Sequence, residues 1–388
     1  MRAKHDFYPT PEKIVERMAR ELSTLERLPE SRKLYGILLK KQPSNREYLL
    51  NAARLDLAAG RTDQALGYLR ALRDDSALDR EGAMQLALAL ASKGKPGEAA
   101  STLLPFAEKE PTNMRLNTQT GKYLLDSDDI DRAVTFLKRA YTISRRQGGD
   151  PDTLFEYGRL AFRQGEVSKG SNRLQLAIKG DPRAHRYRFE LARFLLKADP
   201  ERHETAHKVA VEQLRYLILH AERWAETNNP IKYLDDVHRH LATHYVHEQR
   251  FEKALPHLRR TLELSADDVE TRVKLGTALF QVNHADAEMV LRQVIRQRPN
   301  DAQAALYLGL VSLTKNQSSE ALKWFNRAVE SANPKVAEAH YQLALIHRDR
   351  KQLNTARRHL KLFLKRASED HIFRQDAAGL MKALRSGK

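Results

Sequence analysis

Residues 307–328 read YLGLVSLTKNQSSEALKWFNRA and place a small residue, Gly309, twelve positions before a second small residue, Ala321. Phe325 follows Ala321 by four positions. Two short antiparallel helices can approach closely where each carries a small side chain at their crossing, and the next turn supplies a large apolar residue beside it. The stretch therefore predicts a helical hairpin.

This pattern recurs along the chain at intervals of about 34 residues. The first small residue is found at Ala53, Ala87, Gly121, Gly158, Ala192, Ala242, Gly276, Gly309 and Ala344. The second small residue is found at Ala65, Ala99, Ala133, Gly170, Ala254, Ala287, Ala321 and Ala356. The large apolar residue follows at Leu69, Leu103, Leu137, Leu174, Leu258, Leu291, Phe325 and Leu360. A helical bundle has no cause to hold a fixed period, so the pattern predicts hairpins stacked from residue 12 to residue 369.

The pattern resembles the tetratricopeptide repeat, which also has a proline near its end. Proline occupies that place at Pro43, Pro111, Pro182 and Pro299, where it ends the second helix before the next hairpin begins. The resemblance implies an all-α fold, a right-handed α-solenoid of about nine to ten helical hairpins with a C-terminal capping helix.

Changes in regularity divide the chain into five predicted parts. A long second helix from about Glu204 to Trp224 interrupts the period, and an Asn-Asn-Pro run at 228–230 ends it. The predicted parts are an N-terminal extension at 1–11, a first repeat block at 12–197, an irregular long-helix joint at 198–234, a second block at 235–369, and a capping helix and tail at 370–388.

The composition excludes several classes of chemistry. The 388 residues include no cysteine, which removes disulfides, thiol catalysis and cysteine zinc sites. Phosphate-loop, zinc-protease and serine-elbow motifs are also missing, so we expect neither an enzyme nor a cofactor. The sequence contains no apolar run long enough to span a membrane and its start does not resemble a signal peptide, which predicts a cytoplasmic location.

The resemblance also implies a binding surface, because the first helix of each such hairpin lines a concave groove. Lys and Arg total 67 against 50 Asp and Glu, an excess that favours acidic partners. The groove positions of the earlier repeats hold Arg54, Arg115, Lys122, Phe155, Arg159, Arg163, Arg186, Phe189, Arg193 and Lys197. Cations interleaved with aromatic rings would bind acidic segments and hold apolar anchors beside them. The last repeats place Tyr307 and Tyr341 at these positions, which predicts a less charged sector.

Three histidines, His240, His244 and His247, share one face of a predicted helix. That spacing permits metal binding, but no nearby residues are predicted to orient the rings, so we expect no metal site. We expect instead a part of the groove that gains positive charge as the pH falls towards 6.

These features together predict a scaffold or adaptor that binds a protein partner with acidic or extended segments. Two alternatives remain open. One is an RNA-binding helical-repeat protein, for which the net charge of +17 is favourable. The other is a repeat subunit of a larger polysaccharide-synthesis or secretion assembly.

Overall fold

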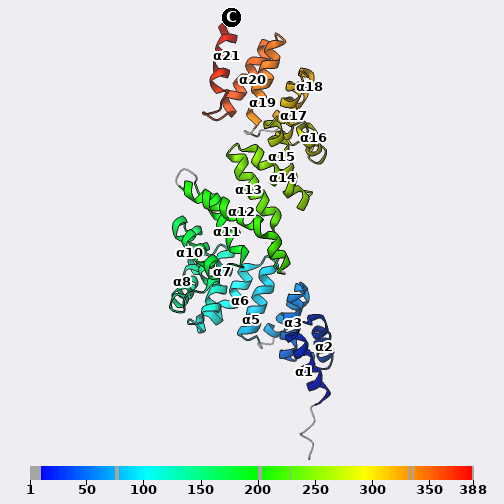
Figure 1. Cartoon of the computed structure of the whole chain (residues 1–388), viewed down its shortest axis with the longest axis vertical. Coiled ribbons are helices and arrows are strands. Elements are labelled where there is room, and N and C mark those ends of the chain that lie inside the picture. Colours follow the sequence, from blue (N-terminus) through cyan, green and yellow to red (C-terminus); the bar gives the residue numbers. More distant parts are fainter. Residues whose placement is uncertain are drawn as a thin grey trace, which may run out of the picture. The chain divides into compact units, whose positions relative to one another are not determined.

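The computed structural model describes residues 10–74, 78–199, 203–227, 229–330, 333 and 336–386. Within these residues all 21 regular elements are α-helices, which confirms the predicted all-α class (Figure 1). Residues 1–9 of the predicted N-terminal extension, and Asn228 of the run expected to end the long helix, lie outside the described residues.

The chain consists of two compact units, unit 1 (Met1–Phe194) and unit 2 (Leu195–Lys388), and the boundary falls inside α11 (His185–Lys197). Unit 1 contains α1 (Pro11–Thr24), α2 (Leu28–Lys41), α3 (Arg46–Ala58), α4 (Thr62–Asp74), α5 (Arg80–Ser92), α6 (Pro96–Lys109), α7 (Met114–Asp126), α8 (Ile130–Arg146), α9 (Pro151–Arg163) and α10 (Val167–Gly180). Each first helix pairs with the second helix that follows it, as α7 does with α8 and α9 with α10.

The first helix that lies entirely within unit 2 is also the longest helix of the described residues. The helices of unit 2 are α12 (Glu204–Glu226), α13 (Leu234–His247), α14 (Phe251–Leu264), α15 (Val269–Gln281), α16 (Ala287–Gln297), α17 (Ala302–Thr314), α18 (Ser318–Glu330), α19 (Ala337–Asp349), α20 (Leu353–Arg366) and α21 (Arg374–Ser386). α12 has 23 residues and occupies the region of the predicted joint. The residue limits given above for the five parts of the chain stay a prediction.

The hairpin crossings have the geometry that the small residues require. A Cβ atom added at Gly121 would lie 2.5 Å from Leu137 Cγ, and one added at Gly276 would lie 2.6 Å from Leu291 Cδ2. Each large apolar residue therefore fills the space beside the small residue of its own hairpin. Ala133 and Ala321, at the second small position, are fully buried.

Local signals in the sequence fix where helices begin and turn. Six first helices begin after an Asn or Asp whose side chain accepts a hydrogen bond from the third backbone N–H of the helix. These capping residues are Asn45, Asp79, Asn113, Asp150, Asp268 and Asp301. The turn between first and second helices contains a residue with positive φ, such as Gly60 and Gly94, because a left-handed residue ends a helix sharply.

The last helix covers the end of unit 2, as the predicted capping helix should. Ala377 and Leu384 of α21 are buried against Leu360 and Phe363 of α20 and Ala344 of α19. This contact removes from water an apolar face that would otherwise have no neighbouring repeat.

Candidate functional site

A buried carboxylate lies at the centre of the predicted basic groove. Glu156 of α9 has a side chain that is 3% exposed, and its Oε2 accepts a hydrogen bond of 2.6 Å from Arg159 Nη1. Arg159 Nη2 donates to Asp126 Oδ1 of α7, also at 2.6 Å. Arg186 of α11 lies 3.8 Å from Glu156 Oε1. The network therefore links three successive first helices.

Arg159 is held in its charged form by these two carboxylates. Burial lowers its pKa, but the negative charges of Glu156 and Asp126 outweigh burial, and the net effect raises the pKa above its ordinary value. A guanidinium that is charged under all working conditions and bonded on both sides is a permanent link between α7 and α9.

Aromatic contacts strengthen the same connection between repeats. The rings of Phe155 and Tyr187 stack with centroids 4.6 Å apart, and those of Phe162 and Phe194 stack at 4.7 Å. The Tyr187 hydroxyl donates to Asp152 Oδ1 at 2.6 Å. These contacts and the Glu156 network form what we call the first-helix ladder, which consists of Asp126, Asp152, Phe155, Glu156, Arg159, Phe162, Arg186, Tyr187 and Phe194.

Four of the predicted basic residues already have carboxylate partners. Arg159 and Arg186 pair as described, Arg163 pairs with Asp128, and Arg193 Nη1 lies 2.6 Å from Glu190 Oε1. The positive charge predicted at these groove positions is therefore partly compensated within the chain. The signal was present in the sequence, since Asp126 and Asp128 precede Arg159 and Arg163 by 33 and 35 residues, one repeat earlier.

Other predicted cations lack a carboxylate partner within the described part of the chain: Arg54, Arg115, Lys122 and Lys197. Arg54 and Arg115 are exposed, and Arg54 Nη2 donates to Ser23 Oγ at 3.2 Å. Lys122 is partly buried, with its Nζ 5.3 Å from the centre of the Tyr123 ring. Lys197 is exposed and belongs to unit 2.

The predicted aromatic anchors are mostly core residues, which corrects their expected contact with a partner. Phe155, Phe189 and Tyr341 are 2%, 6% and 5% exposed. The Tyr341 ring stacks on Phe373 at 4.8 Å, and its hydroxyl donates to Asp376 of α21. Tyr307 is partly buried and meets the Phe280 ring edge-on at 5.5 Å. Position along a first helix does not by itself decide whether a ring points to solvent or to the next repeat.

The three histidines considered for metal binding do not form a cluster. His244 Nε2 lies 3.2 Å from Glu248 Oε1, and His247 is exposed. Nowhere among the described residues do three or more histidine, aspartate or glutamate side chains lie where they could hold a metal ion. His240 therefore belongs to no metal-binding group in that part of the chain.

Two other pairs of histidines were not anticipated from the sequence. His238 Nδ1 lies 3.0 Å from His257 Nδ1, and His340 Nδ1 lies 3.1 Å from His359 Nδ1. Each pair joins the first and second helix of one hairpin across 19 positions. The recurrence of this spacing three repeats later was the signal that could have identified them.

His238 and His340 are buried, their partners His257 and His359 are partly buried, and this environment favours the neutral rings. Burial, followed by the charge of the paired histidine, lowers the pKa of His238 and of His340 to about 4. Burial and the neighbouring His347 lower the pKa of His359 to about 4, and burial also lowers that of His257. Arg366 Nη1 donates to His340 Nε2 at 2.9 Å, so His340 Nδ1 carries the proton that it donates to His359.

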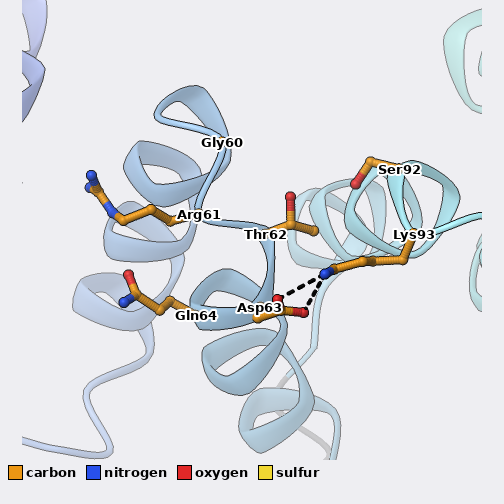
Figure 2. Close-up of a pocket in the computed structure, with 7 residues that line it drawn as sticks. All are labelled: Gly60, Arg61, Thr62, Asp63, Gln64, Ser92 and Lys93. Carbon is orange, nitrogen blue, oxygen red and sulfur yellow. Dashed lines mark hydrogen bonds and ion pairs between the residues drawn. The ribbon is translucent and has the colours of Figure 1, made fainter. Parts of the chain in front are cut away.

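A shallow depression of about 300 Å³ lies between the turns of hairpins α3/α4 and α5/α6 (Figure 2). Lys93 Nζ closes one side of it by pairing with Asp63 at 2.7 Å. Ser92 Oγ donates to Ala89 O within its own helix at 2.8 Å. The other residues that line the depression are Gly60, Arg61, Thr62 and Gln64. The lysine and the serine of this depression therefore both have structural partners within the chain.

A family model described as a tetratricopeptide repeat matches residues 17–80, 50–104 and 278–333. The chain contains tetratricopeptide repeats in both of its units. Tetratricopeptide repeats generally mediate contacts between proteins or act as scaffolds, and their fold is typically non-catalytic. Over the described residues, no helix is both long and apolar enough to cross a membrane.

Several solved structures are similar to this tetratricopeptide repeat protein at low identity. A thermophilic TPR protein from Thermus thermophilus is 23% identical, with a TM-score of 0.38 over 48% of this chain and 99% of that one. A tetratricopeptide repeat protein from Parabacteroides merdae is 15% identical, with a TM-score of 0.40 over 69% and 98%. MamA from Desulfovibrio magneticus is 20% identical, with a TM-score of 0.36 over 45% and 94%. The chain matches no curated protein sequence.

Proposed function

We propose that this tetratricopeptide repeat protein is a scaffold or adaptor that binds an extended client segment along α7, α9 and the part of α11 in unit 1. The segment carries acidic side chains. The general role of these repeats in contacts between proteins supports the proposal, and the charges of the first-helix ladder indicate the kind of segment.

The observation that carries the proposal is an excess of cations around two carboxylates. Lys122, Arg159 and Arg186 surround Glu156 and Asp126, and burial raises the pKa of Glu156 although the three cations oppose this, so at least one positive charge is left over. Arg186 is about half exposed, and its guanidinium lies 3.8 Å from its carboxylate partner, beyond hydrogen-bond distance. Its N–H groups can therefore donate to a carboxylate of a client.

The position of Arg186 is fixed before any client binds. Its guanidinium carbon lies 4.8 Å from the centre of the buried Phe155 ring, and Phe155 itself stacks on Tyr187. A side chain already held in one place loses little conformational freedom on binding, so more of its interaction energy contributes to affinity.

The same geometry argues against base recognition by the first helices. Phe155 and Phe189, the rings that would stack on bases, are buried. Single-stranded nucleic acid binding through bases needs exposed aromatic faces. Protein binding is therefore the function that this surface supports best.

The test is capture of a client from nuclease-treated native lysate by the full chain, followed by identification of the captured protein by mass spectrometry. The double variant Lys122→Glu/Arg186→Glu should lose the client, because each charge-assisted hydrogen bond contributes about 1.5–3 kcal/mol, or about tenfold or more in affinity. The control Lys33→Glu/Lys40→Glu makes the same charge change at exposed positions of α2.

The control variant should retain the client. Equal loss from both double variants would mean that bulk positive charge attracts the client. Retention by both would rule out Lys122 and Arg186 as the client-binding cations.

A further inference from the structure

The second helices α8 and α10 carry a concentration of positive charge that the proposed client surface does not use. Together they hold eight Lys and Arg residues and one acidic residue, Asp131. Arg132 and Lys169 pair with Asp129 and Glu166 at the helix starts. No carboxylate partner is found in the described part of the chain for the other six, which are Lys138, Arg139, Arg145, Arg146, Arg173 and Lys179. We call these six residues the α8/α10 face.

Four of these cations form two rows along α8. Residues three, four and seven positions apart share one face of a helix, which places Lys138 with Arg145 and Arg139 with Arg146. All four side chains are exposed. Each row is about 10 Å long, from seven residues at about 1.5 Å per residue. Charges held this close together raise the local positive potential more than scattered charges do.

A contact between two tilted tyrosine rings and an arginine joins α10 to these rows. The Tyr141 ring of α8 lies 4.4 Å from the Tyr157 ring of α9. The Arg173 guanidinium carbon of α10 lies 4.1 Å from the centre of the Tyr157 ring and 5.6 Å from that of Tyr141. These contacts fix Arg173 next to the rows on α8. The two tyrosine rings contact each other and the arginine.

We propose that the α8/α10 face binds the phosphate backbone of a single-stranded nucleic acid. Clustered cations without carboxylate partners gain most from phosphates, because binding releases the counterions condensed on the strand. Phosphate contacts position a strand without reading its bases, which agrees with tyrosine rings that already contact each other and Arg173. Because phosphate contacts are common to RNA and DNA, we expect both to bind with similar affinity. This site is separate from the client surface on the first helices.

An anionic membrane is the less favoured partner. Peripheral membrane binding combines basic charge with apolar side chains that enter the bilayer. On α8 and α10 the one large apolar side chain that is well exposed in the structure is Leu176, at 47%. A single strand is also flexible enough to follow cations spread over two helices, whereas a duplex is stiff over about 50 nm.

The test is fluorescence anisotropy of the full chain with labelled oligouridine and oligothymidine of about 20 nucleotides, starting at about 50 mM salt. With six phosphate contacts, the slope of log affinity against log salt should be about −4 for both probes. The triple variant Lys138→Glu/Arg145→Glu/Arg146→Glu should bind at least about tenfold more weakly, with a slope near −2. The control Lys33→Glu/Lys40→Glu/Arg70→Glu has the same charge change at exposed positions of unit 1 and should lose less than about threefold.

Three outcomes would overturn the proposal. These are no binding of either oligonucleotide by the unmodified chain at the lowest salt, equal losses from the two triple variants, and binding to phosphatidylserine vesicles without binding to oligonucleotides. Circular dichroism checks that both variants keep their helicity. If the glutamate triple unfolds, the glutamine triple at the same positions replaces it, with the same direction of effect expected.

Discussion

Unit 1 and unit 2 build the same helical hairpin but connect its buried polar groups differently. In unit 1 the first-helix ladder joins repeats through Arg159 and the carboxylates of Glu156 and Asp126. Unit 2 also has a polar link to the following helix, from Tyr341 to Asp376 of α21, and in addition its His238–His257 and His340–His359 pairs join the two helices within a hairpin. Thirteen of the 15 histidines lie at residue 203 or later, since His5 and His185 alone come earlier.

The difference shows that the repeat fixes where helices cross, while the polar links are free to vary. An arginine link stays charged at any pH at which the protein is folded. A neutral histidine pair loses stability when a ring is protonated, because burial disfavours the charge and a proton on the accepting Nδ1 would place two N–H groups opposite each other. The two units should therefore respond differently to charge removal and to acid.

The largest effect is expected from removing the central arginine of unit 1. Arg159→Met leaves the buried Glu156 carboxylate without its hydrogen-bonded cation, which should destabilise unit 1 by about 3–5 kcal/mol. Hydrogen exchange of α7 and α9 measures this loss, and the helices of unit 2 serve as the internal reference. Unchanged protection of α7 and α9 would show that the ladder does not hold the repeats together.

A matched variant sharpens this result. Arg163 pairs with Asp128, but both side chains are well exposed, at 44% and 77%. Exposed pairs contribute about 0–1 kcal/mol, so Arg163→Met should have little effect. Similar losses from Arg159→Met and Arg163→Met would mean that burial of Glu156 is not the cause.

Acidification should destabilise unit 2 more than unit 1. The pKa values of His238 and His340 are lowered from the ordinary 6.5 to about 4, so folding favours their neutral forms. Their stabilisation is fully present above pH 6.5 and is lost as the pH falls towards 4. If each pair takes up one proton, the free energy of unfolding falls by about 2 kcal/mol per pair by pH 5. Hydrogen exchange of α13, α14, α19 and α20 at pH 7 and pH 5 measures it.

The groups around each pair support this direction. Arg260, Arg215 and Glu263 lie near the first pair, and Arg366, Arg358 and His347 lie near the second. The cations in each set oppose protonation, and Glu263 alone favours it. Replacing His238 and His340 by Gln should remove the acid response while keeping a donor and an acceptor at each place. An equal acid response in both units would contradict the assignment to the histidine pairs.

A smaller and equal effect is expected where the two units are alike. Ala133 of unit 1 and Ala321 of unit 2 are fully buried at the second small position of their hairpins. Ala133→Phe and Ala321→Phe should each destabilise the local hairpin by about 1–3 kcal/mol through overpacking. Thermal unfolding followed by circular dichroism would show it. Clearly different losses would mean that the crossings of the two units are not equivalent.

The sequence predicts the hairpins well because their rule is local. Gly309, Ala321 and Phe325 lie within one repeat. Because a larger side chain does not fit at a helix crossing, few residue types can occupy the small positions. The pairing of charges is harder to predict because Arg159 bonds to Asp126 of the preceding repeat. The burial of Tyr341 depends on α21, which follows it by more than 30 residues.

Photo-crosslinking from the first helices tests the central claim most directly. A photoreactive amino acid replaces Arg115, which is exposed on α7, or Arg70, which is exposed on the second helix α4 and serves as the control. In nuclease-treated native lysate, position 115 should form an adduct with a client protein through a peptide rich in Asp and Glu, and position 70 should form none. Equal adducts from both positions, or an adduct from position 70 alone, would contradict client binding along the first helices.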